Sequence, residues 1–131
     1  MSKDNNILIA EDDEMIRKII EEVLGEEFEL IFAEDGKSAL EKAKLNLPEL
    51  IILDIMMPEM NGFEVCKAMR KVDELNTSII IIVTALSDKD SEKTGLKAGA
   101  DDFLTKPFNP IELRTKVQLM FRLRNRLLGL S

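Results

Sequence analysis

The sequence predicts an α/β protein built on one parallel sheet with helices on both faces. Apolar runs of strand length alternate with segments of helical period about five times along the 131 residues. Two of these runs, 49–54 and 78–85, are almost continuously apolar, which is typical of strands buried on both faces. Strands that alternate with helices in this way form a parallel sheet, because each crossover helix packs back onto one face.

Five runs have the character of strands. In chain order they are 6–10, 28–33, 49–54, 78–85 and 101–105. The second run carries Glu29, a charge that an edge strand tolerates, and the last run is short. The continuous apolar runs 49–54 and 78–85 are therefore expected near the centre of the sheet.

Five segments have the period and the end signals of helices. In chain order they are 14–27, 35–47, 61–72, 87–99 and 109–128. Asp35 and Ser87 are candidate N-caps, Gly99 is a candidate C-terminal glycine, and Pro110 suits the first turn of the last helix. Length and the lack of a linker-like tract indicate one domain.

Composition excludes several classes of function. A net charge of -7 argues against nucleic-acid binding, which needs a basic surface. The sequence has no histidine, so His-based metal sites and Ser-His or Cys-His nucleophiles are excluded. No apolar run approaches the roughly 20 residues of a membrane span, and the polar start MSKDNN is no signal peptide. With a single cysteine, Cys66, these features predict a cytoplasmic protein.

Polar residues follow four of the predicted strands. They are Glu11, Asp12 and Asp13 after the first, Asp54 at the end of the third, Thr84 at the end of the fourth and Lys106 after the fifth. In open parallel sheets, ligands bind outside the carboxyl ends of the strands. These side chains are therefore expected to share one rim, which explains a carboxylate inside the apolar stretch LIILDIMMP.

The expected rim has the chemistry of a magnesium and phosphate site. Crowded carboxylates repel one another unless a cation joins them, and oxygen ligands favour Mg²⁺ or Mn²⁺. Lys106 suits phosphate oxygens, Thr84 offers a hydroxyl, and Asp54 is a candidate nucleophile toward phosphorus. The chain has no glycine-rich Walker loop or dinucleotide fingerprint, so nucleotide binding is not expected.

One alternative is an Mg²⁺-dependent aspartyl-phosphate phosphatase. Haloacid-dehalogenase-like phosphatases resemble this site but place a second Asp two residues after the nucleophile. Met56 occupies that position here, so the general acid is missing.

The segments ILIAEDD, LIILDIMMPEMNGFE, IIIIVTA and GADDFLTKPF together resemble the receiver domain of bacterial two-component response regulators. The resemblance runs from Asn6 to Leu123, so residues 1–123 are expected to form the receiver domain and 124–131 a helical extension or linker. It implies a flavodoxin-like, doubly wound, five-stranded sheet of order 2-1-3-4-5 with helices on both faces.

The resemblance also implies the role of each site residue. Asp54 would be the phosphoacceptor. Asp12, Asp54 and the backbone carbonyl of Met56 would ligate Mg²⁺, and Glu11 would hold a metal-bound water. Lys106, the Thr84 hydroxyl and the Ala85 N–H would bind the phosphoryl oxygens. The switch residues would be Thr84 and Phe103, where many relatives carry Tyr, and Lys106-Pro107 would be a cis peptide.

The resemblance implies a signalling switch rather than an enzyme with an external substrate. The phosphoryl donor would be a histidine kinase or a phosphotransfer protein, and the switch would act on an output domain or downstream protein. A constitutive interaction domain with a vestigial site is a further alternative, although all five polar site residues are intact. Leu113, Val117, Met120 and Leu127 have heptad-like spacing, which leaves a homodimer through the last helix open.

Overall fold

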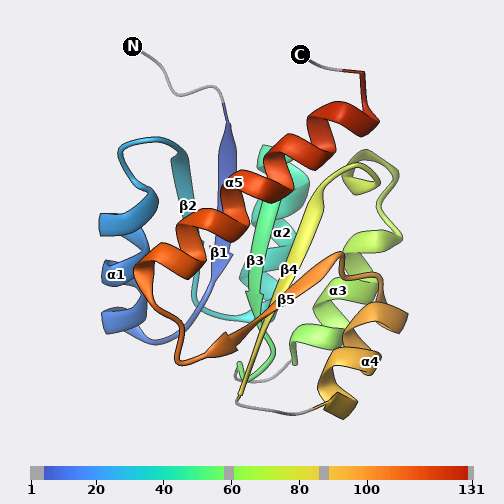
Figure 1. Cartoon of the computed structure of the whole chain (residues 1–131). Coiled ribbons are helices and arrows are strands. Elements are labelled where there is room, and N and C mark those ends of the chain that lie inside the picture. Colours follow the sequence, from blue (N-terminus) through green and yellow to red (C-terminus); the bar gives the residue numbers. More distant parts are fainter. Residues whose placement is uncertain (1–4, 58–60, 86–88, 130–131) are drawn as a thin grey trace.

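The computed structural model describes residues 5–57, 61–85 and 89–129, and they form a five-stranded parallel sheet of order β2-β1-β3-β4-β5 (Figure 1). The strands are β1 Asn6–Ala10, β2 Glu29–Ala33, β3 Leu50–Asp54, β4 Ile79–Ala85 and β5 Asp102–Lys106. The predicted fold class, strand order and parallel pairing are confirmed, and β2, with its exposed Glu29, lies at one edge.

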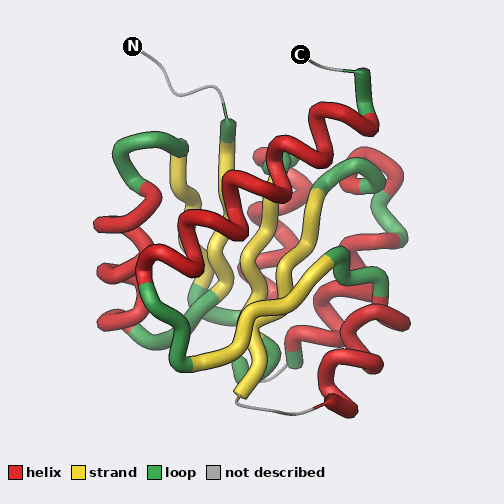
Figure 2. The backbone as a smooth tube through the Cα atoms, in the orientation of Figure 1, coloured by secondary structure: helices red, strands yellow, loops and turns green. Residues whose placement is uncertain are grey.

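Helices cover both faces of the sheet, and Figure 2 shows how they alternate with the strands. The helices are α1 Glu14–Leu24, α2 Gly36–Asn46, α3 Gly62–Arg70, α4 Lys89–Ala98 and α5 Pro110–Leu127, with a short 3₁₀ helix at Asp73–Leu75. Buried side chains of α1 and α5 pack on one face, and those of α2, α3 and α4 pack on the other. Every strand between the two edges is thus buried on both faces, which accounts for the apolar runs.

Several predicted helix ends are confirmed. As predicted, Asp35 caps α2 by accepting a hydrogen bond from the Ser38 N–H. Asp13, which was expected at the rim, also caps α1 by accepting from the Met15 and Ile16 N–H groups. Gly99 has a φ of 108°, a conformation that favours glycine, directly after α4. The predicted cap Ser87 lies outside the described residues.

Two predicted boundaries are wrong. Phe28 was assigned to the second strand, but it lies in the core before β2 and stacks on Phe121, with ring centroids 5.1 Å apart. The first helix was extended to residue 27, but it ends at Leu24 and Gly25 follows as its C-cap. Phe28 thus uses its ring to pack on α5 in the core rather than to extend β2.

The last helix buries most of the heptad-like seam inside its own domain. Leu113, Val117 and Met120 are all buried against the sheet, whereas Leu127 is exposed. A core-facing stripe and a coiled-coil seam share the same three- and four-residue spacing, so the sequence pattern could not separate them. The seam therefore cannot serve a dimer without unpacking the core.

In the part of the chain that the structure describes, none of the helices has the length and apolar character of a membrane span.

Gly62 allows the start of α3 to lie against the end of β3. A Cβ added at Gly62 would lie 2.6 Å from the Ile55 Cα and 2.8 Å from the Asp54 carbonyl oxygen, both of them backbone atoms. The Gly62 N–H donates to the Ile55 carbonyl at 3.1 Å. A glycine at this position thus brings α3 close to the backbone that carries Asp54.

Candidate functional site

Three carboxylates meet at the carboxyl ends of two neighbouring strands. Glu11 and Asp12 follow β1, Asp54 ends β3, and one carboxylate oxygen of each lies within 4.8 Å of the others. The β1–β3 pairing places Ala10 opposite Leu53, so the residues that follow these two are brought side by side. Glu11 and Asp54 are each only 3% exposed, whereas Asp12 is exposed. We call these three residues the acidic cluster.

Lys106 is the counterion of the acidic cluster. From the end of β5 its Nζ lies 2.7 Å from Asp54 Oδ2 and 2.8 Å from Glu11 Oε1. The Lys106-Pro107 peptide bond is cis, as the resemblance implied. One ammonium thus joins acids from two different strands, and this compensates the buried charge of Asp54.

The charges of the cluster shift the pKa values of its members. Burial, together with repulsion from Asp54, raises the pKa of Glu11 to about 7, although the hydrogen bond from Lys106 acts in the opposite direction. Burial alone would lower the pKa of Lys106, but its bonds to Asp54 and Glu11 outweigh this, so its pKa lies above 10.5. The raised pKa of Glu11 thus comes first from its burial, and the cluster places three carboxylates beside one lysine.

Backbone groups orient the buried carboxylates. The Met56 N–H donates to Asp54 Oδ1 at 2.9 Å, so each oxygen of Asp54 has a donor. The Asp13 N–H donates to Glu11 Oε2 at 3.2 Å. The Met56 side chain is 73% exposed and takes no part in the core. Only its backbone position, two residues after Asp54, connects it with the cluster.

Thr84 and Ala85 lie beside the cluster at the end of β4. The β3–β4 register pairs Asp54 with Val83, and the β4–β5 register pairs Ala85 with Lys106. Thr84 is buried and Ala85 is exposed. The strand register thus brings the predicted phosphate-binding residues to the same rim as Asp54 and Lys106.

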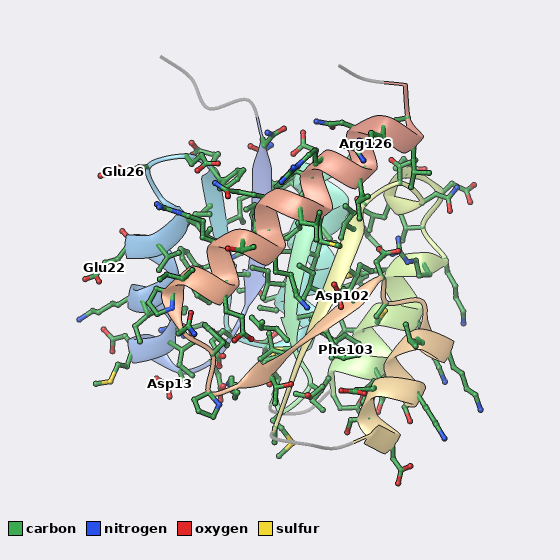
Figure 3. The ribbon with its side chains drawn as sticks, in the orientation of Figure 1. Asp13, Glu22, Glu26, Asp102, Phe103 and Arg126 are labelled. Carbon is green, nitrogen blue, oxygen red and sulfur yellow. The ribbon has the colours of Figure 1, made fainter. Side chains whose placement is uncertain are left out.

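Phe103 lies farther back on β5, three residues before Lys106. Its side chain is half-buried on this edge strand, and Figure 3 shows it near Asp102. The Phe103 carbonyl accepts a hydrogen bond from Lys116 Nζ at 3.0 Å. The register places Phe103 opposite Ile82, two residues before the pair formed by Thr84 and Thr105.

Sequence reasoning missed Arg17 as a residue of this site. Its Nη1 donates to the Glu11 carbonyl at 2.9 Å, and its Nη2 lies 3.5 Å from Glu34 Oε1. An arginine one turn into a helix is usually a surface charge, so composition and spacing gave no signal. Glu11, Asp12 and Asp13 form the loop between β1 and α1, which we call the acidic loop, and the contact of Arg17 with it becomes visible only in three dimensions.

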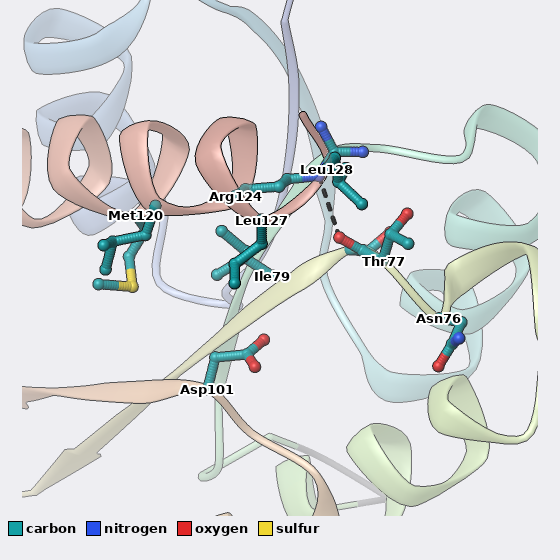
Figure 4. Close-up of a pocket in the computed structure, with 10 residues that line it drawn as sticks. Asn76, Thr77, Ile79, Asp101, Met120, Arg124, Leu127 and Leu128 are labelled. Carbon is teal, nitrogen blue, oxygen red and sulfur yellow. Dashed lines mark hydrogen bonds between the residues drawn. The ribbon is translucent and has the colours of Figure 1, made fainter. Parts of the chain in front are cut away.

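A cavity at the opposite end of the sheet is separate from this rim. It has a volume of about 410 Å³ and lies under the last turns of α5, beside Ile79 at the start of β4 (Figure 4). Arg124 Nε donates to the Thr77 carbonyl at its edge, at 3.0 Å. None of the acidic cluster lines this cavity, so the chemistry of the site has to be sought at the carboxyl ends of the strands.

An open parallel sheet of order 2-1-3-4-5, with acids and a lysine at its carboxyl ends, defines a flavodoxin-like α/β domain with an acidic site at that rim. The sequence profile of the response regulator receiver domain matches residues 7–118. The chain belongs to this family, whose members are phosphorylation-activated switches of two-component systems.

The curated relatives are longer than this chain. Response regulator ArlR of Staphylococcus saprophyticus is 42% identical over 117 residues, which are 88% of this chain and 52% of the relative. The alkaline phosphatase synthesis transcriptional regulatory protein PhoP of Bacillus subtilis is 38% identical over 117 residues, 88% of this chain and 48% of the relative. The chain thus spans about half the length of the curated relatives it matches.

Solved structures of similar proteins cover almost the same length. The chemotaxis response regulator CheY4 of Vibrio cholerae is 32% identical with a TM-score of 0.84, covering 88% of this chain and 98% of that one. The receiver domain of the Francisella response regulator 1452 is 34% identical with a TM-score of 0.81, covering 91% and 98%. These likenesses agree with the fold found here.

Proposed function

We propose that Asp54 accepts a phosphoryl group from a phosphohistidine of another protein, in an Mg²⁺-dependent reaction that changes the partner-binding surface of the domain. The observation that carries this proposal is the place of Asp54, buried between Glu11, Asp12 and Lys106 at the end of β3. None of the 131 residues is a histidine, so the proposed phosphohistidine lies outside them, in a histidine kinase or a phosphotransfer protein.

The residues present fit Mg²⁺. The cluster offers only oxygen ligands, and its three carboxylates outnumber the one lysine that pairs with them, an arrangement that a divalent cation would neutralise. Asp12, Asp54 and the Met56 carbonyl would hold the ion directly, and Glu11 would hold it through water. Mn²⁺ prefers similar ligands. When bound, the ion supplies charge neutralisation and a template for the phosphoryl oxygens.

The chain's own residues supply the nucleophile and the phosphoryl-binding groups. A carboxylate oxygen of Asp54 would form the new bond to phosphorus while the bond from phosphorus to the donor imidazole nitrogen breaks and that nitrogen keeps the electron pair. Lys106, which now bonds to Asp54 Oδ2, is placed to turn to the phosphoryl oxygens. The Thr84 hydroxyl and the Ala85 N–H would donate to those oxygens. Such a transfer depends mainly on positioning of the reacting groups and on charge neutralisation.

The site favours a switch over a phosphatase. The position two residues after Asp54 is Met56, whose exposed side chain has no proton to donate to a leaving group. The intact cluster with its lysine counterion disfavours a vestigial site. We therefore propose self-phosphorylation and slow self-dephosphorylation as the only chemistry, with Thr84 and Phe103 as the switch residues.

The surroundings of the domain are proposed from the relatives. Several of them are named transcriptional regulators and are about twice as long as this chain. We therefore propose that the domain acts on an output domain or a downstream protein. The proposed location is the cytoplasm. Residues 1–123 are proposed as the receiver domain and 124–131 as a C-terminal helical extension or linker. Arg124, within α5, donates a hydrogen bond to the Thr77 carbonyl. A homodimer through the last helix would have to use its exposed face.

The test is incubation with acetyl phosphate and Mg²⁺, followed by intact mass. We expect a single phosphoryl adduct on the parent and none on Asp54→Asn. The matched control is Asp13→Asn, which changes a neighbouring acid of the same loop and keeps an N-cap residue; its adduct should equal that of the parent. An adduct on Asp54→Asn would move the acceptor elsewhere. Release of phosphate from many esters would indicate a phosphatase, and no reaction would indicate a vestigial site.

A further inference from the structure

The backbone sets where the Asp12 side chain begins and the direction in which it leaves the loop. Asp12 is exposed, and within the part of the chain that the structure describes no hydrogen bond or ion pair to its side chain is found. Asp13, the next residue, is fixed because it caps α1, where its Oδ1 accepts from the Met15 N–H at 2.9 Å. The orientation of Asp12 therefore depends on the peptide unit that joins it to Glu11.

Arg17 holds this peptide unit. Its Nη1 donates to the Glu11 carbonyl at 2.9 Å, and this carbonyl belongs to the Glu11–Asp12 peptide. The Glu11 N–H in turn donates to the Ala33 carbonyl at 3.0 Å. Both backbone groups of Glu11 are thus bonded, one by the end of β2 and one by a side chain of α1. The two bonds leave the acidic loop little freedom to rotate.

Arg17 is itself held in place. Its side chain is 18% exposed, and its Nη2 lies 3.5 Å from Glu34 Oε1, in the segment between β2 and α2. Since Glu34 is 74% exposed, this ion pair adds little energy, but it orients the planar guanidinium toward the loop. Lys18, the next residue, pairs with Glu14 on the helix surface, where Lys18 Nζ lies 3.9 Å from Glu14 Oε1.

We infer that Arg17 is a positioning residue for the divalent cation: by fixing the Glu11–Asp12 peptide, it holds Asp12 where the ion needs it. This inference rests on the proposed function and extends it to a residue outside the ligand set. The charge of Arg17 acts in the opposite direction, because a positive charge near the site repels a cation and weakens its binding. Loss of Arg17 should therefore weaken cation binding if Arg17 positions Asp12, and strengthen it if Arg17 acts only through its charge.

The experiment is calorimetric titration of the unphosphorylated domain with Mg²⁺, for the parent, Arg17→Met, Arg17→Lys and the control Lys18→Met. Because loss of a group that orients a metal ligand typically costs 10–100-fold in affinity, we expect about tenfold weaker binding for Arg17→Met. Arg17→Lys keeps the charge but not the planar fork, and it should also bind more weakly than the parent. Lys18→Met removes one charge from the same helix and should bind as tightly as the parent or slightly more tightly.

A second readout separates positioning from loss of stability. Mg²⁺ demands a tighter and more regular geometry than Ca²⁺, so a loosened Asp12 should lower the ratio of Mg²⁺ to Ca²⁺ affinity in Arg17→Met. A variant that is only less stable, but still folded under the assay conditions, would keep this ratio. If Arg17→Met fails to fold, Arg17→Lys decides the question alone.

The outcomes are distinguishable. A parent that binds no Mg²⁺ overturns the proposed function and this inference with it. A parent that binds Mg²⁺, together with Arg17→Met that binds equally well or more tightly, overturns only the inference and shows that Arg17 acts as a charge. Parent-like affinity in Arg17→Lys, with an unchanged ratio of Mg²⁺ to Ca²⁺ affinity, overturns it as well.

Discussion

Replacing Lys106 by methionine tests how the acidic cluster is neutralised in the metal-free domain. The change removes the cation that bonds to Asp54 at 2.7 Å and to Glu11 at 2.8 Å, and it leaves an apolar chain of similar length. Both carboxylates are only 3% exposed, so neither can recover its lost partner from water. We expect Lys106→Met to lower the free energy of unfolding.

The expected loss of unfolding free energy in Lys106→Met follows from the burial of the ion pair and from the pKa of Glu11. Removing one partner of a buried ion pair costs about 3–5 kcal/mol, but the Lys106 side chain is 28% exposed, so solvent screening reduces the expected loss to roughly 2–3 kcal/mol at alkaline pH. Below neutral pH, Glu11 takes up a proton and can then donate to Asp54. The loss near pH 6 should therefore shrink to about 1 kcal/mol.

The sign of the pH dependence follows from the direction of the shift. The pKa of Glu11 rises from 4.5 to about 7 on folding, so its protonation stabilises the fold fully below 4.5 and this contribution is lost as the pH rises through 7. Lys106 is the main group that holds this pKa down, so its removal raises the pKa further. The stability gap between parent and variant must therefore widen as the pH rises.

The assay is urea unfolding followed by far-ultraviolet circular dichroism, in chelator, at about pH 6 and about pH 8.5. The control is Lys116→Met, because Lys116 is 27% exposed and pairs with the half-buried Asp102 at 3.4 Å, far from the acidic cluster. Its loss should stay near 1 kcal/mol or less at both pH values. Saturating Mg²⁺ should narrow the gap for Lys106→Met only. Equal losses for the two lysines, or a gap that does not widen with pH, would refute the reasoning.

Three further predictions concern single residues of the site and the core. Asp12→Ala should weaken Mg²⁺ binding in a calorimetric titration without lowering the urea midpoint in chelator, since it removes a repelling charge; unchanged affinity would shift the ligand assignment to Asp13. Burial raises the pKa of Cys66 to about 11, so iodoacetamide should alkylate it at neutral pH only after urea unfolding, and rapid reaction of the folded domain would contradict its buried position. Met56→Asn should speed decay of the phosphorylated protein in excess Mg²⁺, because an exposed amide can orient the attacking water. From the sequence, Leu86→Glu is expected to speed this decay as well, but Leu86 lies outside the described residues. Equal decay rates of the parent and Met56→Asn would refute the prediction for Met56.

The parallel fold could be predicted because the apolar runs in the sequence correspond directly to strands that are buried on both faces of the sheet. The continuous apolar runs became β3 and β4 at the interior of the sheet, and the charge at Glu29 marked the edge strand β2. Strand ends could be located to within a residue or two, so the acids after β1 and at the end of β3 were correctly expected at one rim.

What the sequence could not reveal depends on contacts between distant elements. Phe28 has the residue type and the neighbours of a strand, yet its ring packs on Phe121 of α5. The spacing of Leu113, Val117 and Met120 suits a coiled coil and a core equally well, and only the sheet beneath them decides. Arg17 and Lys106 likewise acquire their roles from partners on other elements.

The pairing of Lys106 with two acids suggests how a charge change at Asp54 would reach the edge of the sheet. A phosphoryl group on Asp54 offers Lys106 stronger acceptors than the present carboxylate, so the ammonium would leave Glu11, whose charge the divalent cation then balances. Lys106 lies on β5, which pairs only with β4 and is held from the side of α5 by the Lys116 contact with the Phe103 carbonyl. A strand with one neighbour is easier to displace than an interior strand. We therefore expect the first backbone response to phosphorylation along β5, between Lys106 and Phe103, measurable as amide shifts there that vanish in Lys106→Met.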